Sequence, residues 1–403
     1  MSKYNVIDLF AGCGGLLDGF LQTGLYNPIA SVEWEKAQVD TLRNRLKTKY
    51  NVSDADESVI RFDIQRIGEL INGFDDPEYG KSKGLKKIIN KRKIDFIIGG
   101  PPCQAYSVAR RIRSNDKMKT DYRNYLFEYY LKVVEFVNPK LFVFENVPGM
   151  LSAMPDGTPI VDLIREGFEN IGFEIISDIK NNAVVNANDY GVPQNRKRVI
   201  LIGLNKEVFK GNIQELLMDF YNNILPTYSE AGGNVGNAIG DLVGLYPTYA
   251  ETSPSHLPNE LCSITWHIPR FHSPRDVKIF QMLCEDIESG KNEFKDSNIL
   301  KDIYNKVTGS NTKVHKYHVL RKDEPSTTIL AHLYKDGLRF IHYDSKQARS
   351  ITVREAARLQ SFDDDFEFIG SQGYAYKMIG NAVPPILAKK ISLAINDLIK
   401  KYL

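Results

Sequence analysis

The feature that most constrains the fold is a regular alternation of short β-rich runs with helical patterns between residues 4 and 205. Six runs have this composition: YNVIDLF, IASVEW, IDFIIGG, KLFVFEN, FEIISDI and RVILIGL. Amphipathic segments separate most of them, and this rhythm is typical of a largely parallel sheet with helices on both faces. The sequence therefore predicts an α/β fold for this part of the chain.

The alternation is lost between residues 206 and 320, where Gly and Pro punctuate the sequence and RDVKIFQMLCEDIES is the one clear helical pattern. Regular patterns then resume. PSTTILAHL and LRFIHY are expected to be strands, TVREAARLQ a short helix, and ILAKKISLAINDLIKKYL a long helix that packs back on the first domain. We therefore predict one domain from residues 1–205 plus 321–403, and a smaller irregular domain from residues 206–320.

Composition limits the class of protein. The chain has 403 residues and a net charge of +2, which neither requires nor excludes a polyanionic partner. Its four cysteines, Cys13, Cys103, Cys262 and Cys284, form no CxxC pair, so we expect reduced thiols in a cytoplasm and neither a metal site nor a disulfide framework. MSKYNVIDLF contains no signal peptide, and no apolar run reaches membrane-spanning length, so secretion and membrane insertion are not expected.

A glycine-rich segment, DLFAGCGGLLDGF, follows the first expected strand. Small residues between a strand and a helix let a ligand approach the backbone, and the helix N-terminus adds free N–H groups, so a nucleotide-like cofactor is indicated. Leu17 stands where the third glycine of GxGxxG would be, which weakens the case for a dinucleotide.

Polar and aromatic side chains follow the next strands. Glu33 ends the second strand, where a carboxylate can accept both hydroxyls of a ribose. Trp34 offers a stacking face for adenine, and Asp63 in RFDI can accept from its amino group. A tight turn with two exposed carboxylates is the structural alternative.

The segment IIGGPPCQAYS places Cys103 behind two prolines at the end of a strand. Proline fixes φ and cannot extend a helix, so this turn presents the thiol in a defined direction. A buried structural cysteine is an equally good explanation of this segment alone. In FVFENVPG, Glu145 and Asn146 end another strand at the same edge, where a carboxyl in an apolar pocket can stay protonated near neutral pH. Asn146 by itself is better explained as a cap.

Three basic segments complete the pattern. QNRKR brings Arg196 and Arg198 to one side of the following strand, a pair that suits phosphate or a pyrimidine edge. Residues 110–123 have six Lys or Arg against two Asp and could close over a polyanion. KSKGLKKIINKRK at residues 81–93 is also basic, but a solvated helix face explains it better.

Taken together, these motifs resemble the DNA (cytosine-5) methyltransferases of bacterial restriction-modification systems. The resemblance covers residues 5–205 and 321–390 in family order: DLFAGCGG, EW, FDI, GGPPCQAYS, FENV, QNRKR, REAARLQSF and GNAVP. It implies a Rossmann-like class I methyltransferase sheet that binds S-adenosyl-L-methionine and releases S-adenosyl-L-homocysteine. The irregular domain corresponds to the target recognition domain of the family.

The resemblance also implies a mechanism. A target cytosine leaves the duplex, the Cys103 thiolate adds to C6, and Glu145 holds N3 while C5 accepts the methyl group. Arg196, Arg198 and Asn146 complete the implied catalytic set. The implied cofactor contacts are Phe10, Ala11, Gly12, Gly14, Gly15, Leu16, Glu33, Trp34, Asp63, Ile64, Gly100, Pro101, Leu126, Asn381, Ala382 and Val383. The implied DNA contacts are Gln104, Ser107, Arg110, Arg111 and Arg113.

The expected partner is double-stranded DNA, with a cognate restriction endonuclease acting on the same site. We expect a cytoplasmic monomer that associates with the nucleoid when it is bound to DNA. Three alternatives remain. The first is a tRNA cytosine-5 methyltransferase, but that group usually has PPCQPFT, whereas this chain has PPCQAYS. The second is a zinc deaminase, which needs PCxxC and HxE, and both motifs are absent from the sequence. The third is an inactive DNA-binding module, which would not need every reactive residue.

Overall fold

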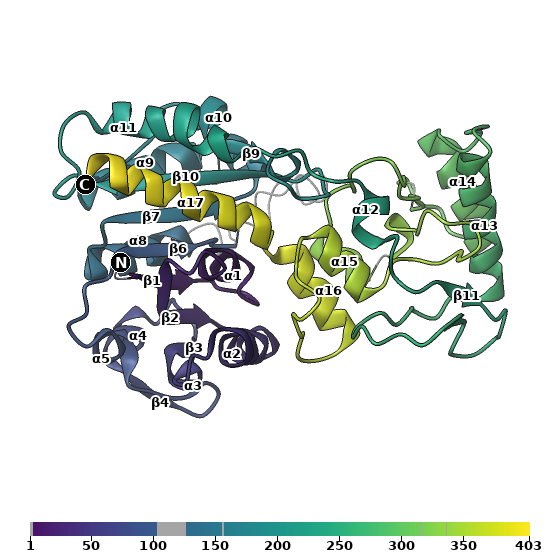
Figure 1. Cartoon of the computed structure of the whole chain (residues 1–403), viewed down its shortest axis with the longest axis horizontal. Coiled ribbons are helices and arrows are strands. Elements are labelled where there is room, and N and C mark those ends of the chain that lie inside the picture. The colour runs from purple at the N-terminus through teal and green to yellow at the C-terminus, as the bar shows by residue number, and fades with distance from the viewer. Residues whose placement is uncertain (1–2, 103–125, 155–156, 315, 336) are drawn as a thin grey trace. The chain divides into compact units, whose positions relative to one another are not determined.

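The computed structural model describes residues 3–102, 126–154, 157–314, 316–335 and 337–403, and Figure 1 shows its elements. The chain divides into two compact units. The first unit comprises Met1–Gly191, Arg196–Ala231 and Ala382–Leu403, and the second comprises Val192–Asn195 and Gly232–Asn381.

These units differ from the division expected from the sequence. Residues 206–231 pack with the first unit because Tyr221 accepts a hydrogen bond from Ile202 N and donates one to Ile200 O, both on the last long strand of the sheet. Residues 321–381 belong to the second unit rather than to the first. The assignment of residues 206–320 to target recognition stays a prediction.

A mixed sheet forms the centre of the first unit (Figure 1). In the described part of the chain it has eight strands in the order β3-β2-β1-β6-β7-β10-β8, with β9 paired to β10. Neighbours from β3 to β7 are parallel, whereas β10 is antiparallel to β7, β8 and β9. The strands are β1 (Tyr4–Leu9), β2 (Tyr26–Glu33), β3 (Val59–Arg61), β6 (Phe96–Gly99), β7 (Leu141–Asn146), β8 (Phe173–Ile175), β9 (Val184–Asn186) and β10 (Lys197–Asn205). The predicted α/β fold and its largely parallel sheet are confirmed.

The remaining elements of the first unit are helices and one small hairpin. They are α1 (Gly15–Leu21), α2 (Lys36–Tyr50), α3 (Ala55–Ser58), α4 (Ile67–Asn72), β4 (Phe74–Asp76), β5 (Gly80–Ser82), α5 (Gly84–Ile89), α8 (Leu126–Val137), η3 (Pro148–Ser152), α9 (Ile160–Asn170), α10 (Ile179–Asn182), η4 (Ala187–Asp189), α11 (Ile213–Asp219), η5 (Phe220–Ile224), η6 (Leu225–Tyr228) and α17 (Pro385–Tyr402).

Aromatic side chains attach helices to both faces of the sheet. On β6, Phe96 packs against Tyr26, which contacts Phe20 of α1 and donates a hydrogen bond to the Ser392 carbonyl of α17. Phe96 is aligned with Leu141 on β7, and successive strand residues point to opposite faces. Phe142 therefore lies on the other face, where it stacks on Phe168 of α9 at 3.9 Å between ring centroids. Helices thus cover both sides, as the sequence predicted.

The last helix, α17, packs closely against α1, the helix that follows the glycine-rich segment. Gly19 makes this approach possible, because a Cβ at this position would lie 2.3 Å from the Pro385 carbonyl oxygen and 2.5 Å from Ala388 Cβ. A side chain at residue 19 would therefore push α17 away. The predicted docking of the C-terminal helix on the first domain is confirmed.

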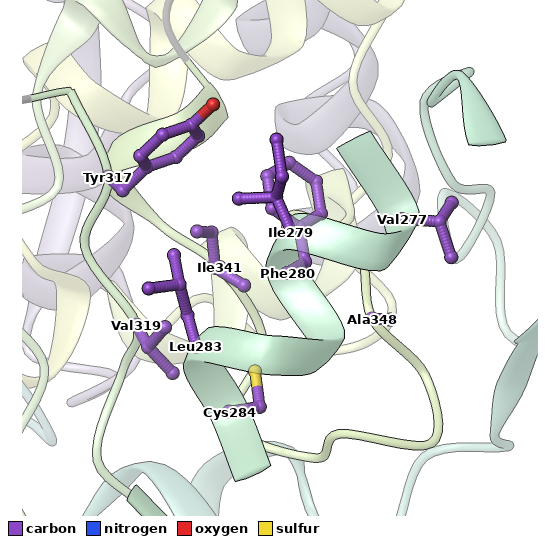
Figure 2. Close-up of a cluster of buried hydrophobic side chains, with 9 residues drawn as sticks. All are labelled: Val277, Ile279, Phe280, Leu283, Cys284, Tyr317, Val319, Ile341 and Ala348. Atoms are coloured by element: carbon purple, nitrogen blue, oxygen red, sulfur yellow. The ribbon is translucent and has the colours of Figure 1, made fainter. Parts of the chain in front are cut away.

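The second unit has its own apolar core, which Figure 2 shows. Phe280, Leu283 and Cys284 of α13 pack with Tyr317 and Ile341, which come from later segments of the chain. Its elements are α12 (Val235–Ile239), β11 (Leu245–Pro247), β12 (His256–Pro258), α13 (Pro274–Glu288), α14 (Ser297–Thr308), η7 (Ala331–Tyr334), η8 (Gly337–Arg339), α15 (Val353–Leu359) and α16 (Gln372–Asn381). The helices expected from RDVKIFQMLCEDIES and TVREAARLQ are confirmed as α13 and α15.

The two strands expected at PSTTILAHL and LRFIHY are wrong. These segments contain the short helices η7 and η8 and isolated bridges at Ser326 and Ile341. Backbone donors of the first segment bind elsewhere: Ser326 N donates to the Pro193 carbonyl, and Ile329 N donates to Gln194 Oε1. Because these donors are already satisfied, no continuous ladder with a neighbouring strand forms here.

A buried ion pair stabilises the N-terminus of α15 in the second unit. The Arg349 guanidinium donates to both carboxylate oxygens of Glu355 at 2.7 Å, and Glu355 also accepts from Thr352 N in a capping box. Burial alone would raise the pKa of Glu355, but the Arg349 charge and its hydrogen bonds hold this pKa well below its usual range. The carboxylate is therefore charged throughout the neutral range.

Among the described residues, none of the helices is both long enough and apolar enough to cross a membrane.

Glu355→Ala should lower the free energy of unfolding by about 3 to 5 kcal/mol, because it leaves the Arg349 guanidinium buried without its partner. Urea denaturation monitored by circular dichroism measures the change. Asp56→Ala, which removes the exposed partner of Lys47, is the matched control and should alter the urea midpoint little. Equal midpoints for the two variants would show that the buried pair is not a source of stability.

Candidate active site

The carboxyl ends of β1, β2, β6 and β7 lie at one edge of the sheet, since these strands are parallel. Strand order changes direction between β1 and β6, because the chain builds outward from β1 first through β2 and β3 and then through β6 and β7. Open α/β sheets bind ligands outside the carboxyl ends of the strands at such a point. Residues predicted from the sequence to be functional follow each of these strands.

The glycine-rich turn after β1 has a left-handed backbone. Phe10 has a φ of 56°, Gly12 a φ of 58° and Gly14 a φ of 92°. A side chain at Gly14 would be strained by this backbone conformation, and its Cβ, 2.5 Å from Leu42 Cδ1, would also displace the end of Leu42. Gly14 N donates to the Ala11 carbonyl and caps a tight loop. The turn therefore exposes backbone in the way that a close ligand requires.

Glu33 fastens this turn to the end of β2. Its Oε2 accepts a hydrogen bond from Gly12 N at 2.9 Å, and its Oε1 accepts from Trp34 N at 2.8 Å and from Glu35 N at 2.9 Å. Burial raises the pKa of this carboxyl, although the three backbone donors oppose the rise. The structure thus brings Gly12, Glu33 and Trp34 together.

The other predicted cofactor residues of this edge differ in exposure. Trp34 is 53% exposed, which leaves its indole free to stack on a ligand. Phe62 N donates to the Glu33 carbonyl at the end of β2, and Asp63 is the next residue in the chain. Asp63 Oδ1 accepts from Gln65 N. Five more predicted residues are buried with 5 to 8% exposure: Ala11, Leu16, Ile64, Leu126 and Val383.

Gly100 lets the chain after β6 pass tightly against the end of β7. A Cβ at Gly100 would lie 2.6 Å from Glu145 Oε2, so only glycine admits the carboxyl here. Asn146 Nδ2 donates to the Pro101 carbonyl at 3.4 Å, and its Oδ1 accepts from Val147 N at 2.8 Å. Asn146 therefore connects the proline turn to the end of β7, which goes beyond the simple cap that its type alone suggested.

Glu145 forms a largely buried ion pair with Arg198. Glu145 Oε1 lies 2.9 Å from Arg198 Nε, and the two side chains are 12% and 11% exposed. Burial raises the pKa of Glu145, and the charges of Arg198 and Arg196 only partly offset this rise. A carboxyl with these surroundings is suited to hold a proton near neutral pH.

Arg196 reaches a different group. It is buried, and its Nη2 donates to the Ala382 carbonyl at 2.9 Å, which connects the start of β10 with the segment before α17. Its charge still acts on Glu145. Asn381, another predicted cofactor residue, is the last residue of α16 in the second unit and is exposed.

The predicted nucleophile Cys103 and the predicted DNA contacts Gln104, Ser107, Arg110, Arg111 and Arg113 lie outside the described residues.

Comparison with known proteins identifies the family. A family model described as C-5 cytosine-specific DNA methylase matches residues 4–397. The chain belongs to this family. It is accordingly a DNA (cytosine-5) methyltransferase, as the resemblance of its motifs predicted.

Similar proteins agree with this assignment. The methylase is 34% identical to the type II methyltransferase M.Bpa9945I of Bacillus paralicheniformis over 98% of this chain and 99% of the relative. It is 33% identical to the type II methyltransferase M1.HphI of Haemophilus parahaemolyticus over 98% of this chain and 89% of the relative. The fold resembles that of a protein described as a DNA modification methyltransferase of an E. coli prophage, with a TM-score of 0.60, 24% identity, and coverage of 99% of this chain and 100% of that one.

Sequence reasoning missed Asp8, which precedes the glycine-rich turn of the methylase. Both of its carboxylate oxygens are buried without a hydrogen-bond partner among the described residues, and so is the hydroxyl of Ser31, its register partner on β2. Burial, and then the nearby charge of Glu33, raise the pKa of Asp8 well above its usual range. The signal in the sequence is a charged residue in the apolar run VIDLF.

A second feature that sequence reasoning missed is a buried ion pair between α1 and α2. Asp18 of α1 forms an ion pair with Arg45 of α2 at 2.6 Å, with both side chains 2% exposed, and accepts from Tyr50 Oη at 2.9 Å. The pair connects α1, which follows the glycine-rich turn, with α2, which follows Glu33 and Trp34. A lone aspartate inside the apolar helix GLLDGFL is the signal that would have found it.

Asp8→Asn should make the methylase more stable relative to the natural chain as pH rises from about 5 to 8. A carboxyl whose pKa is higher in the folded state binds more protons there than in the unfolded state, so its contribution to stability falls as pH rises. Urea denaturation at several pH values measures the difference in the free energy of unfolding. Asp56→Asn, at an exposed carboxylate, should show no such trend in this range. A difference independent of pH for Asp8→Asn would contradict the assignment.

Proposed function

We propose that this methyltransferase acts on a cytosine held between the Cys103 thiol and the Glu145 carboxyl at the carboxyl edge of the sheet. The observation that carries the proposal is Glu145 itself: a largely buried carboxyl with a raised pKa, aligned by Arg198 and in contact with the turn that leads to Cys103. The thiolate adds to C6 of the ring while Glu145 holds a proton at N3. Once C5 has accepted the methyl group, loss of the C5 proton and cleavage of the C6–S bond release the thiolate and restore the ring.

Glu145 has the surroundings for this task. Burial favours the protonated form, which can donate to a ring nitrogen, and the Arg198 guanidinium fixes one carboxyl oxygen. Gly100 keeps the space beside Glu145 Oε2 free of a side chain. Asn146, acting as a positioning residue, connects Pro101 to the same strand end. The proton donor and the turn before the nucleophile are thus parts of one rigid edge.

The target base has to leave the duplex to reach this edge. Cys103 attacks perpendicular to the ring plane at C6, and Glu145 contacts the ring edge at N3, so neither group can reach a base that is stacked and paired. The basic segment at residues 110–123, with Arg110, Arg111 and Arg113, and the neighbouring Gln104 and Ser107 are proposed to hold the opened DNA.

The edge between β1 and β3 fits S-adenosyl-L-methionine. Two buried carboxyls, Asp8 and Glu33, lie at this end, and neither has an ion pair within the described ranges, so a positively charged cofactor suits them. The exposed Trp34 indole suits adenine, and the left-handed turn around Gly12 admits a ligand close to the backbone. When bound, the cofactor supplies an electrophilic methyl group.

Each residue at this edge then has a proposed task. Glu33 accepts from the ribose hydroxyls while it holds Gly12 N, and Asp63 accepts from the adenine amino group. Apolar walls come from buried residues such as Leu16, Ile64 and Leu126. The rest of the proposed cofactor set is Phe10, Ala11, Gly14, Gly15, Gly100, Pro101, Asn381, Ala382 and Val383.

The partners follow from the proposed reaction. The substrate is double-stranded DNA, and a restriction endonuclease that cuts the same unmodified site is the proposed companion, since the relatives are type II methyltransferases. We propose that the enzyme works in the cytoplasm as a monomer on nucleoid DNA, with residues 206–320 as its target recognition domain.

Cys103→Ser should abolish methyl transfer and leave DNA binding largely intact, because serine keeps the shape of the side chain but is a far weaker nucleophile at neutral pH. Bisulfite sequencing of DNA from cells that express each variant measures activity and reveals the methylated sequence. Cys262→Ser is the matched control and should retain full activity. Persistent methylation by Cys103→Ser would refute the nucleophile, and methylation of tRNA but not of duplex DNA would refute the substrate.

Glu145→Gln should lower kcat by about 100-fold to 10,000-fold, the range expected when a positioned proton donor is lost. The natural enzyme should lose activity as pH rises through the raised pKa of Glu145, whereas the variant should lack this alkaline limb. Radiolabelled methyl incorporation into duplex DNA over a pH series provides both measurements. Glu135→Gln on the exposed side of α8 should behave like the natural enzyme. An unchanged alkaline limb in Glu145→Gln would assign that titration to another group.

A further inference from the structure

Positive charge is concentrated in a segment of the first unit that the proposed function does not use. Residues 81–93 contain seven of the 52 Lys and Arg residues and no Asp or Glu. The remaining 45 basic residues are outnumbered by 50 acidic ones, so the chain owes its net charge of +2 to this segment. A concentration of this kind creates a local potential that the net charge conceals.

Four of these lysines are exposed and without an acidic partner in the part of the chain that the structure describes. We call Lys86, Lys87, Lys91 and Lys93 the amino-edge lysines. The other members of the segment are occupied: Lys81 and Lys83 form ion pairs with Asp75 and Glu57, and Arg92 donates to the carbonyls at the end of α5. The amino-edge lysines therefore present free ammonium groups to solvent.

The apolar residues of the segment point inward. Leu85 is fully buried, Ile88 is 4% exposed and Ile89 is partly buried, so α5 exposes mainly its charged side. A protein-binding surface normally has an apolar centre, and a membrane-binding helix needs apolar side chains to insert. This surface has neither, which leaves a polyanion recognised by charge as the occupant that fits it.

The amino-edge lysines lie at the opposite edge of the sheet from the proposed site. Lys91 and Lys93 come just before β6, and the Lys93 carbonyl accepts from Asn5 Nδ2 at the start of β1. Glu145 and the proline turn, by contrast, follow the carboxyl ends of β7 and β6. A duplex in contact with Glu145 would have its target base at the far edge, so these lysines are not part of that contact.

We propose that the amino-edge lysines bind the phosphate backbone of a second stretch of duplex DNA. This inference rests on the proposed function in one respect, namely that the enzyme works on long duplex DNA and so always meets further segments of the same polymer. Contacts of lysine with phosphate release counterions and carry no sequence information. The enzyme would thus hold one segment by charge while its site engages another, and pass between segments without leaving the DNA.

The test compares two variants with the same change in net charge. One replaces the amino-edge lysines by glutamine, K86Q/K87Q/K91Q/K93Q. The matched control, K180Q/K206Q/K210Q/K400Q, removes four exposed lysines that are scattered over the first unit and form no ion pair within the described ranges. Equal melting temperatures establish that both variants fold. Should the first fail to fold, K86Q/K87Q and K91Q/K93Q are tested separately.

Binding to a duplex without the target sequence is measured over a series of salt concentrations. Each lost phosphate contact lowers the slope of log K against log salt by about 0.9, so the amino-edge variant should lose a slope of about 3 to 4. The control should lose less than about 1. Equal slopes for the two variants would overturn the proposal.

A second measurement tests whether one enzyme molecule binds two duplexes at the same time. With a short target duplex in saturating amount, the natural enzyme should bind a second labelled duplex, and the amino-edge variant should not. Poly-glutamate that displaces the second duplex at equal charge concentration would overturn the assignment to DNA in favour of an acidic protein segment. Methyl transfer to the short duplex should be unchanged in both variants. Absence of methyl transfer by the natural enzyme would refute the proposed function. Equal salt slopes would refute only the proposed binding of a second duplex by the amino-edge lysines.

Discussion

Arg198 meets Glu145 because β10 runs antiparallel to β7, so the strand that brings the arginine begins where the strand that brings the carboxyl ends. Had β10 been parallel, Arg198 would lie at the other edge of the sheet and Glu145 would be buried without a cation. The cost of such a charge is several kcal/mol, so the carboxyl and the topology depend on each other. Gly100 and Asn146 then bring the proline turn to this pair, because one leaves space and the other supplies a hydrogen bond.

Charge divides the carboxyl edge into two halves. Between β1 and β2, Asp8 and Glu33 are buried without an ion pair in the described parts of the chain, and burial raises the pKa of each. Beside β7, Glu145 has Arg198 against it and Arg196 nearby. A cationic ligand lowers the cost of burying the first pair of carboxyls, whereas a neutral ring fits the balanced half. The order of the strands thus supports the proposal that cofactor and base occupy different places on one edge.

The sequence alone predicted those features that depend on local patterns and on the order of motifs along the chain. Alternating runs predicted the sheet, and motif order predicted that Gly12, Glu33 and Trp34 meet. It failed where long-range hydrogen bonds decide. PSTTILAHL has strand composition, but Gln194 and Pro193 accept hydrogen bonds from its backbone donors. The burial of Asp8 likewise follows from the pairing of β1 with β2 and β6. The unit boundary near residue 231 was also hidden, since it depends on Tyr221 binding β10.

The packing of α17 on α1 has a consequence for the order of folding. It joins segments that are far apart in the chain, since Tyr26, which packs on Phe20 of α1, donates to the Ser392 carbonyl of α17 across 366 residues. A contact of this kind forms slowly, because the entropy of closing the long loop is lost before the contact stabilises the fold. The glycine-rich turn therefore gains the support of α17 through α1 only at a late stage, when the distant segment docks.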